Sequence, residues 1–207
     1  MHNILIDGSK EAKNIFIFAH GAGSPMDSDF MNSVVKYLIS NGIMTVRFEF
    51  LYMQKKKNGI KLFPDKIEKL SEYFISIIHY VKKLFLNKNI WIGGKSLGGR
   101  VACIVSKKVE INGVIVFGYP FHSLKNPKNI RDEVLRQKGP PVLILQGDRD
   151  KMGNKNEVIS YNLKNKAKIL FLEGGDHSFL TLNTSKFSQN DLIKLACTEA
   201  NNFINKN

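Results

Sequence analysis

The segment from residue 90 to residue 100, IWIGGKSLGGR, overlaps two motifs with unrelated chemistries. Its Gly-Lys-Ser is typical of a phosphate-binding loop, whereas its Gly-x-Ser-x-Gly is typical of the turn that presents a nucleophilic serine. The phosphate-binding loop needs a further glycine at position 89, where this chain has Asn89. The nucleophile turn needs a strand, small residues two positions before and after the serine, and a helix. Gly94, Ser96 and Gly98 meet this requirement, so we interpret Ser96 as a candidate nucleophile.

A serine hydroxyl becomes a good nucleophile only when a histidine takes its proton and an acid orients that histidine. Both partners follow in the chain, in the order serine, acid, histidine. Asp148 and Asp150 follow the apolar stretch PVLILQG, and His177 follows AKILFLEGG. Because sites in parallel sheets form at the C-terminal ends of the strands, we expect Ser96, His177 and one of these carboxylates to meet. Asp176 is a third candidate, but a residue adjacent to a histidine can seldom fold back onto its ring.

The stretch AHGAGSP, residues 19–25, supplies small residues that leave backbone amides free to face a substrate. We assign the amides of Ala22 and Leu97 to an oxyanion hole. Two further side chains are candidate substrate contacts: Lys95, beside the nucleophile, and His122, after a later apolar stretch. For each, the alternative is a structural role, with Lys95 filling space in the turn and His122 packing a loop.

The remaining histidines do not predict a metal site. We expect His20 to shape the loop after the first strong strand, and His79 to lie on the polar side of a helix. No pair of histidines has the spacing of a His-Glu-x-x-His motif, so we expect neither a metal nor another cofactor.

Apolar stretches rich in Ile, Val and Phe alternate with segments of helical periodicity. Strands are predicted at residues 14–20, 43–50, 89–94, 113–119, 141–147 and 167–174, and MHNILIDG is a candidate for an antiparallel edge strand. Helices are predicted at residues 28–40, 65–85, 97–107, 154–163 and 188–204, with a short one in NIRDEVLRQ. This alternation predicts an α/β fold with a mostly parallel twisted sheet and helices on both faces.

The bulk properties are those of an ordinary globular chain. Its 207 residues, 43% hydrophobic and 24% charged, predict one domain over residues 1–207. The longest apolar runs fall far short of the ~20 residues that span a bilayer, and the N-terminus does not read as a secretory signal. Cys103 and Cys197 are expected to be small buried residues in a reducing compartment, which favours a cytoplasmic location.

The formal charge of +13 suggests a polyanionic partner, but the residue types that supply this charge argue against one. Arginine, the preferred reader of phosphates and guanine edges, supplies only five of the 31 basic residues. The lysines are scattered, with QKKKNG at 54–59 the only tight run. We therefore expect a solvated basic surface and neither a nucleic-acid nor a membrane partner.

The chain resembles the α/β-hydrolase superfamily at its minimal size. The resemblance is carried by HGAG (20–23), GGKSLGGR (93–100), GYPFH (118–122), LQGDRD (145–150) and GDHSF (175–179). It is closest to a group of small predicted hydrolases that are similar to dienelactone hydrolases and include a testis-expressed protein and a subunit of a histone acetyltransferase complex. The resemblance implies the α/β-hydrolase fold, hydrolase activity and a triad of Ser96, Asp150 and His177. It favours Asp150 over Asp148 because the family's acid usually stands three residues after the glycine that ends its strand.

The sequence thus predicts a serine hydrolase that cleaves small carboxylic esters or thioesters through an acyl-enzyme intermediate. Only residues 119–141 separate two predicted strands where lids of this fold are usually inserted, so we expect no large cap and an open site. The alternatives are a non-catalytic scaffold with the same fold and a basic protein associated with nucleic acid. A complete triad favours the enzyme, because a scaffold has no use for all three groups.

Overall fold

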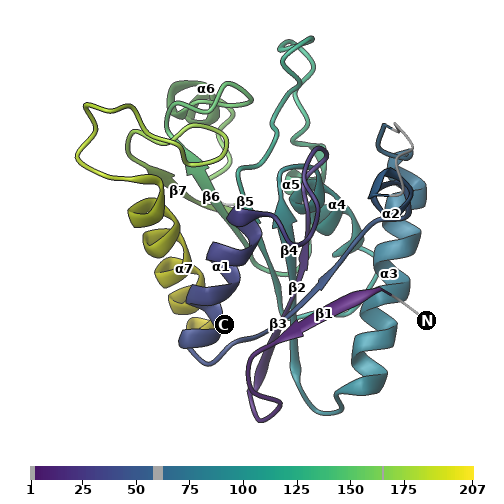
Figure 1. Ribbon diagram of the computed structural model, residues 1–207. Coiled ribbons are helices and arrows are strands. Elements are labelled where there is room, and N and C mark those ends of the chain that lie inside the picture. Colours follow the sequence, from purple (N-terminus) through teal and green to yellow (C-terminus); the bar gives the residue numbers. More distant parts are fainter. Residues whose placement is uncertain (1–2, 58–62, 165) are drawn as a thin grey trace.

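The computed structural model describes residues 3–57, 63–164 and 166–207 of the chain (Figure 1). At its centre is a seven-stranded sheet with the strand order β1-β3-β2-β4-β5-β6-β7. In chain order the strands are β1 (Ile4–Asp7), β2 (Asn14–Ala19), β3 (Met44–Phe48), β4 (Asn89–Lys95), β5 (Gly113–Phe117), β6 (Val142–Gly147) and β7 (Lys168–Leu172).

Neighbouring strands run parallel except at one edge, where β1 pairs antiparallel with β3. Every residue of β3, β5 and β6 is buried. Their sequences are apolar except for Thr45 and Arg47 in β3 and Gln146 in β6, as expected for strands covered on both faces. The predicted α/β class, with its mostly parallel sheet and an antiparallel edge strand from the N-terminal segment, is confirmed.

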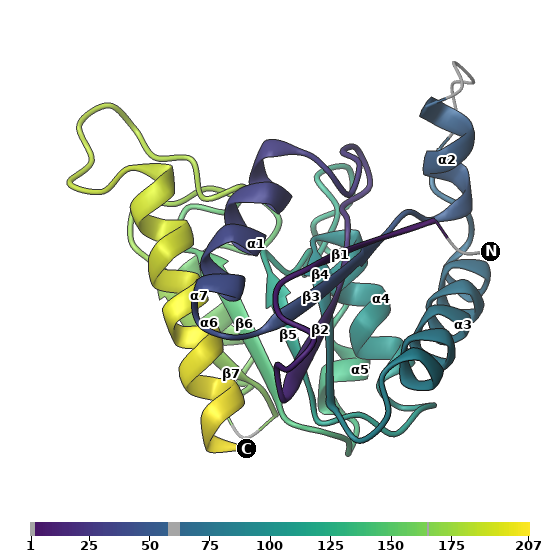
Figure 2. The same ribbon diagram turned by 60° about the horizontal axis from the view of Figure 1, so that its bottom comes forward.

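Helices cover both faces of the sheet (Figures 1 and 2). They are α1 (Asp29–Ser40), α2 (Leu51–Lys57), α3 (Ile67–Leu84), α4 (Leu97–Val105), α5 (Glu133–Arg136), α6 (Lys155–Ser160) and α7 (Gln189–Lys206). Helices α1 and α7 pack on one face, and α2, α3 and α4 pack on the other. Side chains of β2 alternate between the two apolar clusters, with Ile15 and Ile17 in one and Phe16 and Phe18 in the other.

Two predictions about helices were wrong in detail. Helix α2 was not predicted, because its apolar residues Leu51, Tyr52 and Met53 are consecutive and show no helical period. The helix predicted at residues 65–85 is shorter in the structure, where α3 begins at Ile67 and ends at Leu84. The exposed position of His79 is as expected.

A loop connects the end of β6 to α6, and the residues at the start of α6 define where this loop ends. The Asn154 side chain accepts hydrogen bonds from the amides of Asn156 (3.0 Å) and Glu157 (3.1 Å). The Glu157 carboxylate in turn accepts from the Asn154 amide (2.8 Å). This capping box satisfies amides that have no acceptor within the helix, and so fixes where the loop after β6 ends.

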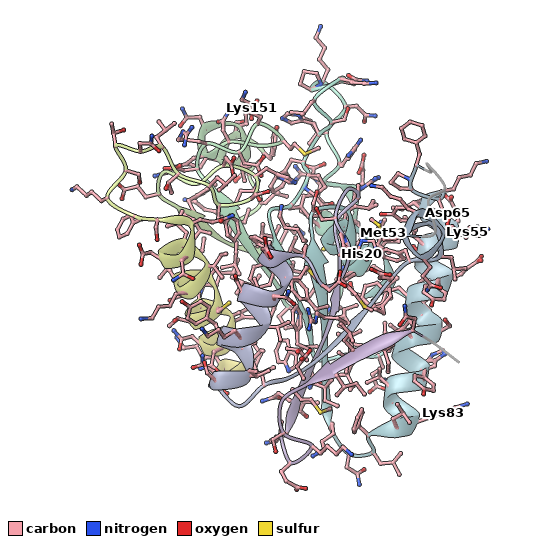
Figure 3. The ribbon with its side chains drawn as sticks, viewed as in Figure 1. His20, Met53, Lys55, Asp65, Lys83 and Lys151 are labelled. Atoms are coloured by element: carbon pink, nitrogen blue, oxygen red, sulfur yellow. The ribbon has the colours of Figure 1, made fainter. Side chains whose placement is uncertain are left out.

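The segment between β5 and β6 contains only the short helix α5, so no cap domain is inserted there. None of the helices in the described part of the chain combines the length and apolarity needed to cross a membrane. Cys103 and Cys197 are buried and form no disulfide, and burial raises the pKa of each thiol to about 12. Lysines point outward from separate regions, among them Lys55, Lys83 and Lys151 (Figure 3).

Candidate active site

Ser96 lies between the end of β4 and the start of α4 in a conformation that few non-glycine residues adopt, with φ 52° and ψ −114°. The surrounding backbone leaves no room for side chains on the flanking glycines. A Cβ on Gly98 would lie 2.6 Å from the carbonyl oxygen of Ala19, and one on Gly94 would overlap Gly98. The predicted strand, sharp turn and helix around Ser96 are therefore present. The turn directs Ser96 toward the carboxyl end of the sheet.

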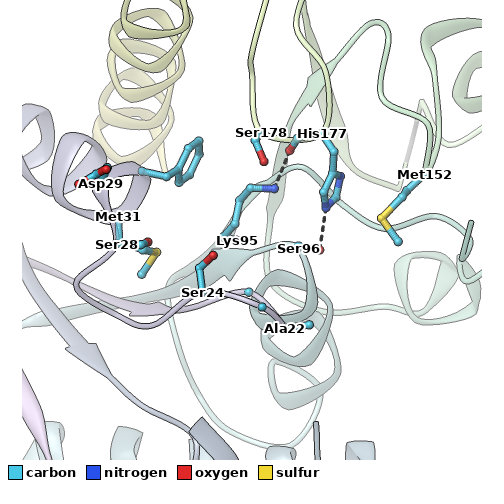
Figure 4. Close-up of a pocket in the computed structure, with 13 residues that line it drawn as sticks. Ala22, Ser24, Ser28, Asp29, Met31, Lys95, Ser96, Met152, His177 and Ser178 are labelled. Carbon is cyan, nitrogen blue, oxygen red and sulfur yellow. Dashed lines mark hydrogen bonds between the residues drawn. The ribbon is translucent and has the colours of Figure 1, made fainter. Parts of the chain in front are cut away.

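The structure brings Ser96, His177 and Asp150 together from the ends of three parallel strands, β4, β7 and β6. His177 Nε2 lies 2.7 Å from Ser96 Oγ, and His177 Nδ1 lies 2.6 Å from Asp150 Oδ2. Because an ionised carboxylate can only accept hydrogen bonds, Nδ1 carries the ring hydrogen. Nε2 is then left to accept the hydrogen of the serine hydroxyl (Figure 4).

Asp150 is fully buried and its carboxylate is held by two further donors. Oδ2 accepts a hydrogen bond from Gln146 Nε2 (2.8 Å), and Oδ1 accepts one from the Met152 amide (2.7 Å). Gln146 is itself buried in β6, and its Oε1 accepts from the Tyr119 amide (2.8 Å). The acid is thus fixed on the side of the imidazole away from Ser96.

The other two candidate carboxylates are engaged elsewhere. Asp148 Oδ1 accepts from the amide of Gly174 (2.9 Å), which ties the end of β6 to the end of β7. Asp176 Oδ1 accepts from the amides of Ser178 (2.7 Å) and Leu180 (2.9 Å), within its own loop. Both carboxylates support the loops around the site, and the contact with the His177 ring is made by Asp150.

Lys95 places a positive charge beside the nucleophile. Lys95 is only 8% exposed, and its Nζ donates a hydrogen bond to the carbonyl oxygen of His177 (2.5 Å; Figure 4). Nζ also lies 5.5 Å from the centre of the Phe30 ring. Burial lowers the pKa of Lys95 from 10.5 to about 8, although the charges of Asp150 and Asp176 act in the opposite direction.

The loop after β2 is anchored by two aromatic side chains. The Phe50 amide donates to His20 Nε2 (3.1 Å), so Nδ1 carries the hydrogen and donates to the carbonyl of Gly21 (2.6 Å). The Tyr52 hydroxyl, from α2, lies within hydrogen-bonding distance of the carbonyl oxygens of Gly21 (3.3 Å) and Ala22 (3.2 Å). These bonds keep the carbonyl oxygens of Gly21 and Ala22 directed toward the protein interior.

A pocket of about 510 Å³ opens beside Ser96 (Figure 4). Its walls come from the loop after β2, the start of α1, the nucleophile turn and the loops after β6 and β7, and comprise Gly21, Ala22, Gly23, Ser24, Ser28, Asp29, Phe30, Met31, Lys95, Ser96, Met152, His177 and Ser178. Ala22 is part of this wall, and Leu97 is the first residue of α4, where a helix amide has no acceptor of its own. The pocket is of a size that holds a small organic molecule.

A family model described as an alpha/beta hydrolase domain matches residues 12–205. The chain belongs to this family. The matched region runs from just before β2 into α7 and includes every residue of the site.

Three solved structures illustrate the fold that this α/β-hydrolase shares with other proteins. Est1E from Butyrivibrio proteoclasticus has a TM-score of 0.73 at 16% identity, over 98% of this chain and 93% of that chain. A serine hydrolase without lid from Xanthomonas campestris has a TM-score of 0.73 at 15% identity, over 97% and 88%. A dienelactone hydrolase from Anabaena variabilis has a TM-score of 0.68 at 15% identity, over 94% and 88%. At these identities the likeness establishes the fold alone.

The structure places His122, a predicted candidate for substrate contact, away from the pocket beside Ser96. In this α/β-hydrolase the side chain of His122 is buried, and the residue is absent from the pocket wall beside Ser96. The segment after β5 turns back under the loop after β6, where the His122 amide donates to the carbonyl of Met152 (3.3 Å). The imidazole Nε2 lies 3.6 Å from Glu157, which is consistent with the alternative of loop packing.

Sequence reasoning missed two residues that support the site, Gln146 and Tyr52. Gln146 had a usable signal, because a polar side chain in an otherwise apolar buried strand must find hydrogen-bond partners. Tyr52 had none, because α2 itself was not predicted.

Proposed function

We propose that this α/β-hydrolase cleaves small carboxylic esters or thioesters through an acyl-enzyme intermediate. The observation that carries the proposal is the hydrogen-bonded chain from Ser96 through His177 to Asp150 at the wall of an open pocket. Its distances lie in the range that proton transfer in general base catalysis requires.

In this mechanism Ser96 Oγ attacks the acyl carbon while His177 Nε2 takes the hydroxyl proton. The negative charge that develops on the carbonyl oxygen is stabilised by the amides of Ala22 and Leu97. His177 then gives its proton to the leaving alkoxide or thiolate as the bond to the acyl carbon breaks. Water attacks the acyl-enzyme in the same way, which releases the acid and restores Ser96. Asp150 keeps the imidazole oriented and stabilises its cation throughout.

The substrate class rests on the pocket. Its volume and the absence of a cap between β5 and β6 favour short acyl groups. We assign Lys95 to substrate binding, because among the described residues of the pocket wall its ammonium is the cationic group that can pair with an anionic group on the acyl part of the substrate. The motifs GGKSLGGR and LQGDRD favour the small hydrolases that are similar to dienelactone hydrolases, and one structural neighbour bears that name.

A fluorophosphonate probe tests the proposal, because it labels only an activated serine. The probe should label the wild-type protein at Ser96, and Ser96→Ala should abolish both labelling and hydrolysis of p-nitrophenyl acetate. Ser24→Ala is the matched control, since Ser24 lies in the same pocket wall and should be dispensable for labelling. A folded wild-type protein that resists the probe would favour the non-catalytic scaffold instead.

A further inference from the structure

A second pocket, of about 320 Å³, lies between α4 and α5 and shares no lining residue with the pocket beside Ser96. Four cationic side chains line it, Arg100, Lys107, Lys108 and Arg131. The carboxylate of Glu133 is the acidic group among its described lining residues. Four positive charges therefore face one negative charge in a concave site.

The two arginines of this pocket differ from the other three arginines of the chain. Arg47 and Arg136 pair with carboxylates, and Arg149 donates to a backbone carbonyl. For the guanidinium groups of Arg100 and Arg131, the described residues supply neither a hydrogen-bond acceptor nor an acidic partner. Arginine is the side chain best suited to bidentate contacts with phosphate, and two arginines line this pocket without an acceptor among the described residues.

The cations of this pocket lie close together at an electrostatic cost. Burial lowers the pKa of Arg131, and the charge of Arg100 lowers it further, while burial also lowers the pKa of Lys107. The backbone of Arg131 is fixed on both sides: its amide donates to the carbonyl of Phe121 (2.7 Å), and its carbonyl accepts from the buried Tyr119 hydroxyl (2.7 Å). Repulsion between neighbouring cations is relieved when an anion binds between them.

We propose that the pocket between α4 and α5 binds a compact polyanion, the phosphate or diphosphate group of a small molecule. The rest of its described wall is aliphatic or amide, including Ile104 and Val134, and contains no aromatic ring on which a base could stack. Its shape and composition thus favour a small phosphate-bearing ligand over a nucleic-acid strand. The inference does not depend on hydrolase activity, because the two pockets are separate.

Titration calorimetry with inorganic pyrophosphate at low ionic strength tests the proposal. The wild-type protein should bind one equivalent, and Arg131→Gln should weaken binding about tenfold or more, as expected for a lost bond between charged groups. Arg149→Gln is the matched control, because it removes the same charge from a different pocket and should leave the dissociation constant nearly unchanged. Hydrolysis of p-nitrophenyl acetate should be the same in the three proteins.

A second variant guards against misfolding of Arg131→Gln. Lys108 is exposed, so Lys108→Gln should retain the wild-type melting temperature and still bind pyrophosphate more weakly. Three results would overturn the proposal. One is the lack of saturable pyrophosphate binding by the wild-type protein. Another is equal weakening by Arg131→Gln and Arg149→Gln. The third is tighter binding of a short DNA duplex than of pyrophosphate, which, like the second, would indicate diffuse attraction to the basic surface.

Discussion

At the scale of single residues, three carboxylates lie in the loops around His177, and their hydrogen bonds assign them different tasks. Asp150 contacts the imidazole, whereas Asp148 and Asp176 accept hydrogen bonds from backbone amides. A carboxylate that orients a histidine and one that ties two loops together should respond differently to substitution.

Asp150→Asn should lower kcat by up to about 10⁴-fold, because an amide in this position no longer selects the tautomer with the hydrogen on Nδ1. Its melting temperature should change little. Asp148→Ala removes the acceptor of the Gly174 amide and should cost mainly stability, on the order of 1 kcal/mol. Steady-state kinetics and thermal unfolding of both variants check this. The opposite pair of phenotypes would require a triad that contains Asp148.

Lys95→Met should stabilise the protein at pH 7. Burial lowers the pKa of Lys95 from 10.5 to about 8, so the folded protein holds an ammonium ion that the unfolded chain would hydrate better. Between pH 8 and 10.5 the unfolded chain binds more protons than the folded one, and the free energy of unfolding of the wild type should rise with pH. The variant lacks this dependence.

The advantage of Lys95→Met should be on the order of 3 kcal/mol at pH 7 and should shrink toward pH 10.5. Urea unfolding of both proteins at several pH values measures it. A difference that is independent of pH would contradict the assigned cause. We also expect the variant to lose preference for p-nitrophenyl esters whose acyl group carries a carboxylate, compared with neutral esters of the same length.

At the scale of elements, the short helix α2 reaches across to the loop that carries Ala22. Its Tyr52 hydroxyl lies close to two carbonyl oxygens of that loop, and burial raises the pKa of this hydroxyl, so it remains a donor. A loop that must present an amide to a developing negative charge needs such support, because small displacements of a donor weaken an oxyanion hole.

Tyr52→Phe should therefore lower kcat several-fold and cost about 1 kcal/mol of stability, the usual contribution of one hydrogen bond. Tyr37→Phe is a suitable control, because the Tyr37 hydroxyl bonds to the exposed Asn190 side chain away from the pocket. Kinetics with p-nitrophenyl acetate and thermal unfolding separate the two effects. A loss of stability with unchanged kcat would limit the role of Tyr52 to packing.

At the scale of the whole molecule, the described strands form one sheet and the described helices cover it. The pocket of about 510 Å³ is bounded by loops and the start of α1, and the segment between β5 and β6 provides only α5 where a lid would stand. An open pocket of this kind offers little apolar surface on which a long acyl chain could be buried.

For p-nitrophenyl esters, kcat/KM should consequently fall from acetate or butyrate toward palmitate. A series of esters of increasing chain length, measured below the critical micelle concentration of each, checks the trend. A maximum at long chains, or activation by an added lipid interface, would contradict an open site.

The sequence by itself determined the sheet and the order of the candidate residues along the chain. Continuous apolar stretches predict parallel strands because such strands are buried on both faces, and glycines around Ser96 predict the turn because that backbone excludes side chains. Both signals are local, which is why strand positions and the loops of Ser96, Asp150 and His177 could be read directly.

Only the tertiary structure decided which side chains meet. The bond from Gln146 to Asp150, the contact of Tyr52 with the loop of Ala22 and the inward turn of His122 depend on how loops fold over the ends of separate strands. The same holds for Arg100 and Arg131, which are distant in sequence but line one pocket between α4 and α5. Hydrogen bonds and charge pairs act over a few ångströms in space, and spacing along a chain does not report that distance for residues on different elements.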